Sequence, residues 1–151
     1  DFLEMVNESR SSIESITIPE GVTTIDEGAF CGCSSLKSIT IPEGVTAIDS
    51  RTFCRCSFLK SITIPEGVTK ICSFAFEDCS SLKSITIPHS VTTIGSHAFS
   101  GCSSLTAITI PEGVTMKPFG DRRQGDAFYG CTLLIASAKS RNMSVEELLR
   151  D

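Results

Sequence analysis

The sequence predicts a β-solenoid with a short helix at each end. Three observations lead to this prediction: a segment recurs at a fixed step of 23 residues, each copy contains one alternating polar and apolar stretch, and both ends change to helical patterns. A fixed period of this size is typical of repeat proteins in which each copy forms one coil that stacks on the next. An isoleucine–proline pair marks the step, at Ile18, Ile41, Ile64, Ile87 and Ile110 with Pro19, Pro42, Pro65, Pro88 and Pro111.

Length and composition exclude several classes of protein. The chain has 151 residues, enough for one domain, and carries a net charge of −5 with no basic run longer than Arg122 and Arg123. Nucleic-acid binding needs clustered basic side chains, so we expect no nucleic-acid partner. No apolar stretch approaches the roughly 20 residues of a membrane span, so we expect no membrane insertion.

One coil, residues 36–56, shows how a repeat folds. Ser38 to Ile41 alternates polar and apolar side chains and is rich in β-branched residues, which favours a short half-buried strand. Pro42 ends the strand and begins a turn that contains glycine. The inward-facing positions of the coil are Leu36, Ile39, Ile41, Val45, Ile48, Phe53 and Cys56.

A coil of this size cannot bury its own interior, so stacking has to supply the core. Equivalent side chains of neighbouring coils lie ~5 Å apart when parallel strands pair in register. Each isoleucine or phenylalanine buried in this way contributes roughly 1.5–3 kcal/mol. A reduced cysteine packs as a small apolar group at one of these positions. The cysteines concerned are Cys33, Cys56, Cys79, Cys102 and Cys131.

The repeat resembles the BspA-type (Treponema pallidum-type) leucine-rich repeat, with about five 23-residue copies over residues 11–136. The resemblance rests on Leu36, Ile39, Ile41, Pro42, Val45 and Ile48, and on Ala29, Phe30 and Cys33. It implies a right-handed solenoid with one short parallel strand per coil on one face and mostly irregular or short strands on the other. Known members are commonly microbial adhesion proteins that are secreted or held at the cell surface, and they share no catalytic residues.

A solenoid needs caps because its terminal coils expose strand edges and core. At the N-terminus, Asp1 and Glu4 fit a capping box at the start of a short amphipathic helix. We therefore divide the chain into an N-terminal helical cap, a five-coil solenoid with an insertion, and a C-terminal helical cap. The boundaries are 1–10 for the first cap, 11–131 for the solenoid, 116–125 for the insertion and 132–151 for the second cap.

The C-terminal cap follows from a change of pattern after the fifth coil. Leu133 is expected to take the position of Leu36, but no alternating strand follows it. Residues 135–139 are helix-prone, and Ser144 and Glu147 fit a second capping box. Two caps favour a complete small solenoid over a slice of a longer array.

The fifth coil departs most from the period. From Val114 to Cys131 there are 18 residues where Val91 to Cys102 has 12, which leaves six extra residues within 116–125. This loop could contact an acidic partner, or it could be a tolerated surface insertion, because loop entropy grows slowly with length. Its basic side chains are Lys117, Arg122 and Arg123.

Cys31 and Cys54 share a position two residues before the cysteines of the core. Adjacent coils would bring them within disulfide range, and with Cys33 and Cys56 they form a set of four thiols. The usual zinc-binding spacing is absent, and two of the four thiols belong to the core. Free thiols are therefore favoured over a disulfide, and a disulfide over zinc. We expect no metal and no cofactor.

A row of threonines is expected to face outward along the predicted strands, at Thr17, Thr40, Thr63, Thr86 and Thr109. In leucine-rich repeats this face is the usual partner-binding face. Lysines flank it on one side at Lys37, Lys60 and Lys83, and glutamates on the other at Glu20, Glu43, Glu66 and Glu112. A regular threonine array could instead order water, as ice-binding solenoids do, or could simply be ordinary exposed strand surface.

The sequence shows no recognisable set of catalytic residues. The only histidines, His89 and His97, are expected to be solvated, and no nucleophile–base motif or phosphate loop occurs. We therefore predict a non-catalytic protein-interaction module whose partner is another protein of unknown identity. Two settings fit: a surface or secreted adhesin, and an accessory or scaffold subunit of an intracellular or organellar assembly. An ice-binding protein and an enzyme are the alternatives.

Overall fold

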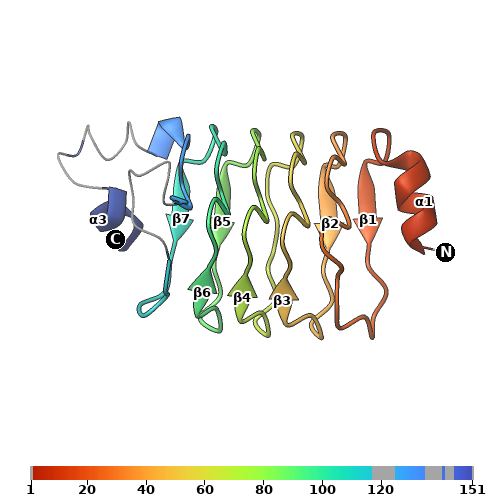
Figure 1. The fold of residues 1–151 in the computed structure, drawn as a ribbon, viewed down its shortest axis with the longest axis horizontal. Coiled ribbons are helices and arrows are strands. Elements are labelled where there is room, and N and C mark those ends of the chain that lie inside the picture. Colours follow the sequence, from red (N-terminus) through yellow and green to blue (C-terminus); the bar gives the residue numbers. More distant parts are fainter. Residues whose placement is uncertain (1, 117–124, 135–140, 142–144, 151) are drawn as a thin grey trace.

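The computed structural model describes residues 2–116, 125–134, 141 and 145–150. The coils stack side by side along one axis, between helix α1 (Phe2–Ser9) at one end and helix α3 (Val145–Arg150) at the other (Figure 1). Strands of successive coils pair in parallel. The predicted solenoid of short parallel strands is therefore confirmed.

The strands form two separate rows along the solenoid (Figure 1). The first row contains β1 (Ser15–Thr17), β2 (Ser38–Thr40), β5 (Ser84–Thr86) and β7 (Ala107–Thr109). The second row contains β3 (Ala47–Ile48), β4 (Lys70–Ile71) and β6 (Thr93–Ile94), which pair in the order β3-β4-β6. Because the pairings between these strands join residues one repeat apart, isoleucine pairs with isoleucine, as Ile16 with Ile39 and Ile48 with Ile71.

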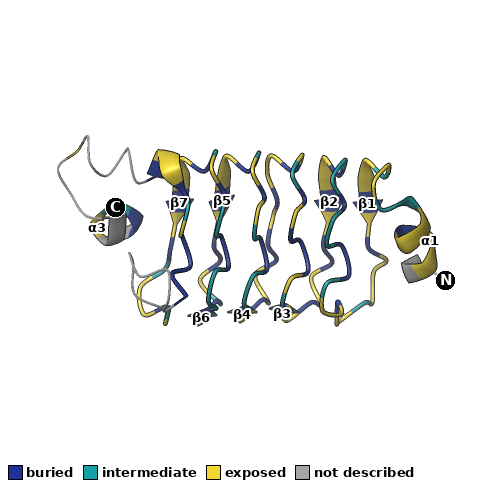
Figure 2. Cartoon of the chain, turned by 45° about the horizontal axis from the view of Figure 1, so that its top comes forward, coloured by how far each residue is buried: buried dark blue, intermediate teal, exposed yellow. Residues whose placement is uncertain are grey.

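Each tripeptide of the first row buries its central residue and exposes the two beside it (Figure 2). This is the alternation that the sequence predicts. We call the outward side of this row, together with residues 61–63 of the third coil, the strand face.

The core consists of columns of identical side chains. Consecutive phenylalanine rings are stacked with centroids 5.3–5.6 Å apart and planes within 16° of parallel. The stacked rings are those of Phe30, Phe53, Phe76, Phe99 and Phe128. The five cysteines predicted for the core are completely buried beside them. Stacked aromatic rings at this spacing add attraction beyond the apolar area that they bury.

Helix α1 lies at the N-terminal end and contributes Val6 to the core. The Arg10 guanidinium, just after the helix, donates hydrogen bonds to the main-chain oxygens of Ala29 and Cys31, which ties this end to the first coil. Asp1, the first residue of the expected capping box, lies outside the described residues.

At the C-terminal end, α3 lies near β7, and its Leu149 is buried in the core. The expectation for Leu133 is wrong: Leu134 is 1% exposed and takes the Leu36 position, whereas Leu133 is 47% exposed. The reason is spacing, because Leu36 follows Cys33 by three residues and Leu134 follows Cys131 by the same three. The predicted helix-prone segment at 135–139 and Ser144 lie outside the described residues.

The fifth coil loses the register of the second row. Thr115 bridges Thr93, and the Ile94 amide donates to the Thr115 oxygen at 2.9 Å. Met116 packs partly buried against the core. The description resumes at Gly125, whose φ of +82° is the left-handed conformation that glycine adopts without a steric penalty.

Candidate interaction surfaces

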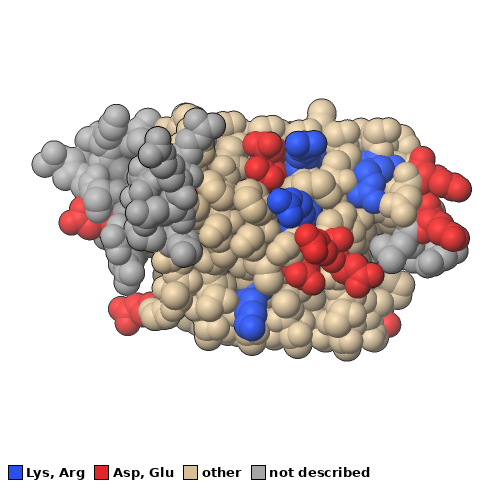
Figure 3. All heavy atoms as spheres, viewed as in Figure 1, with Lys and Arg blue, Asp and Glu red and all other residues tan. Residues whose placement is uncertain are grey.

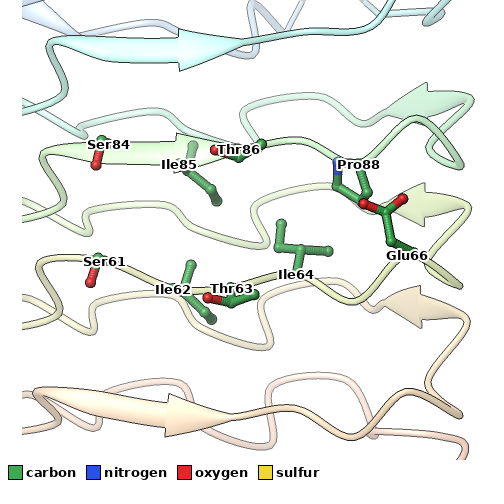
Figure 4. A pocket seen from close by; sticks show the side chains of 9 residues that line it. All are labelled: Ser61, Ile62, Thr63, Ile64, Glu66, Ser84, Ile85, Thr86 and Pro88. Atoms are coloured by element: carbon green, nitrogen blue, oxygen red, sulfur yellow. The ribbon is translucent and has the colours of Figure 1, made fainter.

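The strand face gathers the outward hydroxyl groups of the repeat. The predicted threonines Thr17, Thr40, Thr63, Thr86 and Thr109 are all exposed, and parallel pairing in register places them in one row. Figure 4 shows Ser61 beside Ser84 and Thr63 beside Thr86 on neighbouring coils. The face therefore presents polar groups in a regular arrangement to whatever approaches it.

The row is discontinuous at the third coil. Residues 61–63 join the fourth coil through one isolated bridge, between Thr63 and Thr86. In the described chain no main-chain hydrogen bond joins 38–41 to 61–64. Main-chain donors and acceptors on this part of the face are therefore open to water or to a partner.

Two hollows of about 260 Å³ each lie on either side of residues 61–64. Ser61, Ile62, Thr63, Ile64, Glu66, Ser84, Ile85, Thr86 and Pro88 line the first (Figure 4). Ile39, Thr40, Ile41, Glu43, Thr63 and Pro65 line the second. Thr63 lines both hollows, so they form one interrupted depression across the middle of the strand face.

Charge differs between the two edges of the strand face. At one edge Lys37 pairs with Glu14, with nitrogen and oxygen 3.2 Å apart. Lys60 and Lys83 are exposed at the same edge and form no ion pair within the described part of the chain. At the other edge Glu43 and Glu66 border the hollows. A partner therefore meets positive charge on one side of this face and negative charge on the other.

The remaining predicted contact residues, Lys117, Arg122 and Arg123, lie outside the described residues. Their role as a contact loop stays a prediction.

Sequence reasoning missed a stacked row on another side of the coils. The Arg51 guanidinium lies 4.6 Å from the centre of the Phe74 ring, and that ring stacks on His97 with centroids 5.1 Å apart. Glu27 extends the row through an ion pair to Arg51 at 3.6 Å. His97 is half-buried in this stack and not fully solvated as expected, because Phe74 covers one face of its ring.

The backbone of this row is unusual. Arg51, Phe74 and His97 have φ values of 58°, 61° and 56°, in the left-handed region that bulky residues avoid. Gly28 holds the same position in the first coil with φ of 67°. That glycine was the signal in the sequence, because its column predicts a left-handed residue in each later coil.

Figure 3 shows one face of the solenoid, on which acidic and basic side chains are interspersed. Several acidic side chains gather near the middle of this view, and no extended basic patch covers the described residues of that face. This distribution differs from the basic surface that a nucleic-acid partner would require.

Cys31 and Cys54 are joined by a disulfide, with Cα atoms 4.6 Å apart. Cys54 is buried and Cys31 half-buried. Among the described residues, no three histidine, cysteine, aspartate or glutamate side chains are grouped so that they could hold a metal ion. The bond therefore links the first two coils covalently, at a position where sequence reasoning favoured free thiols.

The thiols of the core are expected to be unreactive. Burial raises the pKa of the Cys56 thiol to about 12, and the same desolvation raises the pKa of Cys131 to about 12. Burial also raises the pKa of Cys33, Cys79 and Cys102. Because the thiolate is the reactive form, these groups serve packing and not nucleophilic chemistry.

The described helices are too short and too polar to cross a bilayer.

Parallel strands one repeat apart, isoleucine columns and a polar strand face together define a leucine-rich-repeat solenoid. The family model for the BspA type leucine rich repeat region matches residues 7–135 in six copies. The chain belongs to this family. Its Leu36 position recurs six times, at Ile13, Leu36, Leu59, Leu82, Leu105 and Leu134.

Solved structures show the same fold. A leucine-rich repeat protein from Bacteroides ovatus is 38% identical, with a TM-score of 0.69 over 80% of this chain and 30% of its own. A leucine rich cell surface protein from Faecalibacterium prausnitzii is 37% identical, with a TM-score of 0.62 over 78% of this chain and 29% of its own. The pneumococcal vaccine antigen PcpA is 26% identical, with a TM-score of 0.64 over 70% of this chain and 26% of its own.

The chain therefore spans less than a third of the length of these three structures. A leucine rich repeat protein of T. pallidum shares the fold at 24% identity, with a TM-score of 0.55 over 85% of this chain and 69% of its own. No curated protein matched the sequence. The family, together with relatives described as a cell surface protein and as a vaccine antigen, supports a protein-interaction repeat module.

Proposed function

We propose that this chain is a non-catalytic binding module that holds another protein on its strand face. The observation that carries the proposal is the interrupted depression at the third coil, where two hollows meet at Thr63. Open main-chain groups and outward hydroxyls there can pair with a polypeptide, and the opposite charges of the two edges fix its orientation.

We further propose that the module works at a cell surface or in a secreted protein. Two relatives are described as a cell surface protein and as a vaccine antigen, which supports this setting. The Cys31–Cys54 disulfide supports it as well, because such bonds persist in oxidising compartments. An accessory subunit of an intracellular assembly is the alternative setting, in which these two thiols would be reduced.

A capture experiment with matched variants tests the binding proposal. The double variant Thr63→Tyr, Thr86→Tyr places two large side chains in the depression, and we expect it to lose partners that the wild-type chain retains from an extract of the native source. The control is Ala47→Tyr, Thr93→Tyr in the second row, at positions equivalent to Lys70, where a long side chain is already accommodated. Equal capture by wild type and strand-face variant would exclude the strand face as the binding site.

The loop at 116–125 is tested separately. A variant shortened to the regular coil length removes Arg122 and Arg123 and should lose capture only if the loop contacts the partner. We expect the strand-face variant to lose more capture than the shortened loop, because the two hollows and the open main-chain groups lie on the strand face. The reverse order would assign the main contact to the loop.

A further inference from the structure

Phe58 breaks the repeat without serving the core. Its ring is 52% exposed, and the residue at the equivalent position is the exposed Leu133 in the last repeat and serine in the other four, at Ser12, Ser35, Ser81 and Ser104. Serine supports the same turn in those coils, so folding does not require an aromatic ring here. Aromatic residues are enriched at protein interfaces, where they act as anchors that bury a large area.

The surroundings of Phe58 are basic on one side. Phe58 lines a hollow of about 130 Å³ with Glu14, Ser35 and Lys37. Lys60 follows two residues later and directly precedes the strand-face segment 61–63 of the same coil. The Lys83 amide donates to the Lys60 main-chain oxygen at 3.1 Å, so the two lysines stand on adjacent coils. The exposed ring therefore borders a column of lysines.

The charges of that column are unequally compensated. Glu14 neutralises Lys37 at 3.2 Å, which leaves Lys60 and Lys83 as the lysines of this edge without an ion pair in the described part of the chain. Glu43 and Glu66 lie at the opposite edge of the strand face, beside the hollows. An acidic ligand is attracted to the lysine edge and repelled from the glutamate edge, although the chain as a whole carries −5.

We propose that Phe58, Lys60 and Lys83 form a docking point for an acidic extended segment of a partner protein. An apolar side chain of the segment packs against the Phe58 ring, and carboxylates of its neighbours pair with Lys60 and Lys83. The segment continues over the hydroxyls of Ser61 and Ser84, which line the adjoining hollow. This inference rests on the proposed function and specifies the chemistry of the partner.

The test uses three pools of short synthetic peptides and the ¹⁵N-labelled full chain. The first pool carries acidic residues beside a leucine or phenylalanine, the second replaces the acidic residues with lysine, and the third replaces the apolar residue with serine. We expect the first pool to shift the amide resonances of Phe58, Lys60 and Lys83. The other two pools should bind at least about fivefold more weakly. Added salt of about 0.5 M should weaken binding of the first pool.

Variants keep the test independent of folding. Phe58→Ser introduces the residue that four other repeats carry, and Lys60→Glu reverses an exposed charge, so both should fold. We expect each to weaken binding of the first pool by about fivefold. Lys70→Glu on β4, in the second row, is the matched charge control and should bind like wild type.

The remaining outcomes overturn the proposal in distinguishable ways. Equal binding of the lysine pool, or unchanged binding by Phe58→Ser, would exclude an acidic segment anchored at Phe58. Self-association that Phe58→Ser abolishes would assign the patch to a second copy of the chain. If Thr63→Tyr with Thr86→Tyr abolishes protein capture while the Phe58 and Lys60 variants do not, this inference fails and the proposed function stands. If none of these variants changes capture, both fail.

Discussion

The thiol of Cys79 donates a hydrogen bond to the main-chain oxygen of Phe53, with sulfur and oxygen 3.2 Å apart across the boundary between two coils. The same bond occurs in the three remaining pairs of successive coils, from Cys56 to Phe30, from Cys102 to Phe76 and from Cys131 to Phe99. The column therefore gives buried carbonyls a second donor besides filling volume. A purely apolar residue of similar size could not replace cysteine here without losing that bond.

The thiol column predicts how the protein reacts with a thiol reagent such as an aromatic disulfide. In the native chain we expect the five core thiols to be inert and only half-buried Cys72 to react, slowly, because burial also raises its pKa. After denaturation without a reductant, all six free thiols should react, and after reduction all eight cysteines. Eight reactive thiols before reduction would contradict the bond between Cys31 and Cys54.

Stability should fall steeply at alkaline pH. Burial raises the pKa of Cys56 and Cys131 from the ordinary 9.0 to about 12. Between these values the folded chain keeps protons that the unfolded chain has lost, so the free energy of unfolding decreases as pH rises. The expected loss is about 1.4 kcal/mol per pH unit for each of these two thiols above pH 9, and none below about pH 8.

Urea unfolding at about pH 8 and about pH 10 measures this effect. Cys131→Ala is the control: it should lower stability at both pH values and reduce the difference between them by about 1.4 kcal/mol. A difference as large as that of wild type would show that Cys131 is not the group responsible.

The sequence was sufficient to predict the strands of the first row and the columns of the core. The step between Ile18 and Ile41 predicted parallel pairing one coil apart, and the alternation at 38–41 predicted which side chains are buried. The columns of phenylalanine and cysteine followed from the same step, because stacked coils place like residues on like.

Differences in strand pairing between segments of identical sequence could not be predicted. Ser61, Ile62 and Thr63 repeat the tripeptide of β2 letter for letter, yet they form one bridge where β2 forms a full pairing. The spacing between coils depends on every side chain that packs between them, and no local pattern carries that information. The candidate site lies at this irregularity, which is why sequence reasoning found its residues and not its shape.

The stacked row makes an unusual mutational prediction at Phe74. Its left-handed backbone costs about 1–2 kcal/mol in a residue other than glycine, and its ring contacts with Arg51 and His97 offset part of that cost. Phe74→Ala keeps the cost and loses the contacts, so we expect a loss of about 1–2 kcal/mol. Phe74→Gly removes both and should be close to wild type in urea unfolding. Equal stability of the two variants would contradict the left-handed assignment.

The register of the solenoid is tested by Ile62→Asp. Ile62 is buried in the central coil, so an aspartate there has to bury a charge without a partner or distort the stack. We expect the thermal transition of the whole array to be lost or lowered by more than about 10 °C. Ser61→Asp, one residue earlier on the exposed side, is the matched control and should change the midpoint little. An unchanged midpoint for Ile62→Asp would refute the inward position of this residue.

The threonine row should not bind ice. An ice-binding surface has to be flat and regular over several coils, and here the depression at Thr63 separates Thr17 and Thr40 from Thr86 and Thr109. We therefore expect no thermal hysteresis when growth of a single ice crystal is observed in solutions of the chain. If hysteresis were found, Thr40→Leu with Thr63→Leu would locate it, because loss of the effect would place ice binding on the strand face. Hysteresis that persisted in this variant would place ice binding on another surface of the chain.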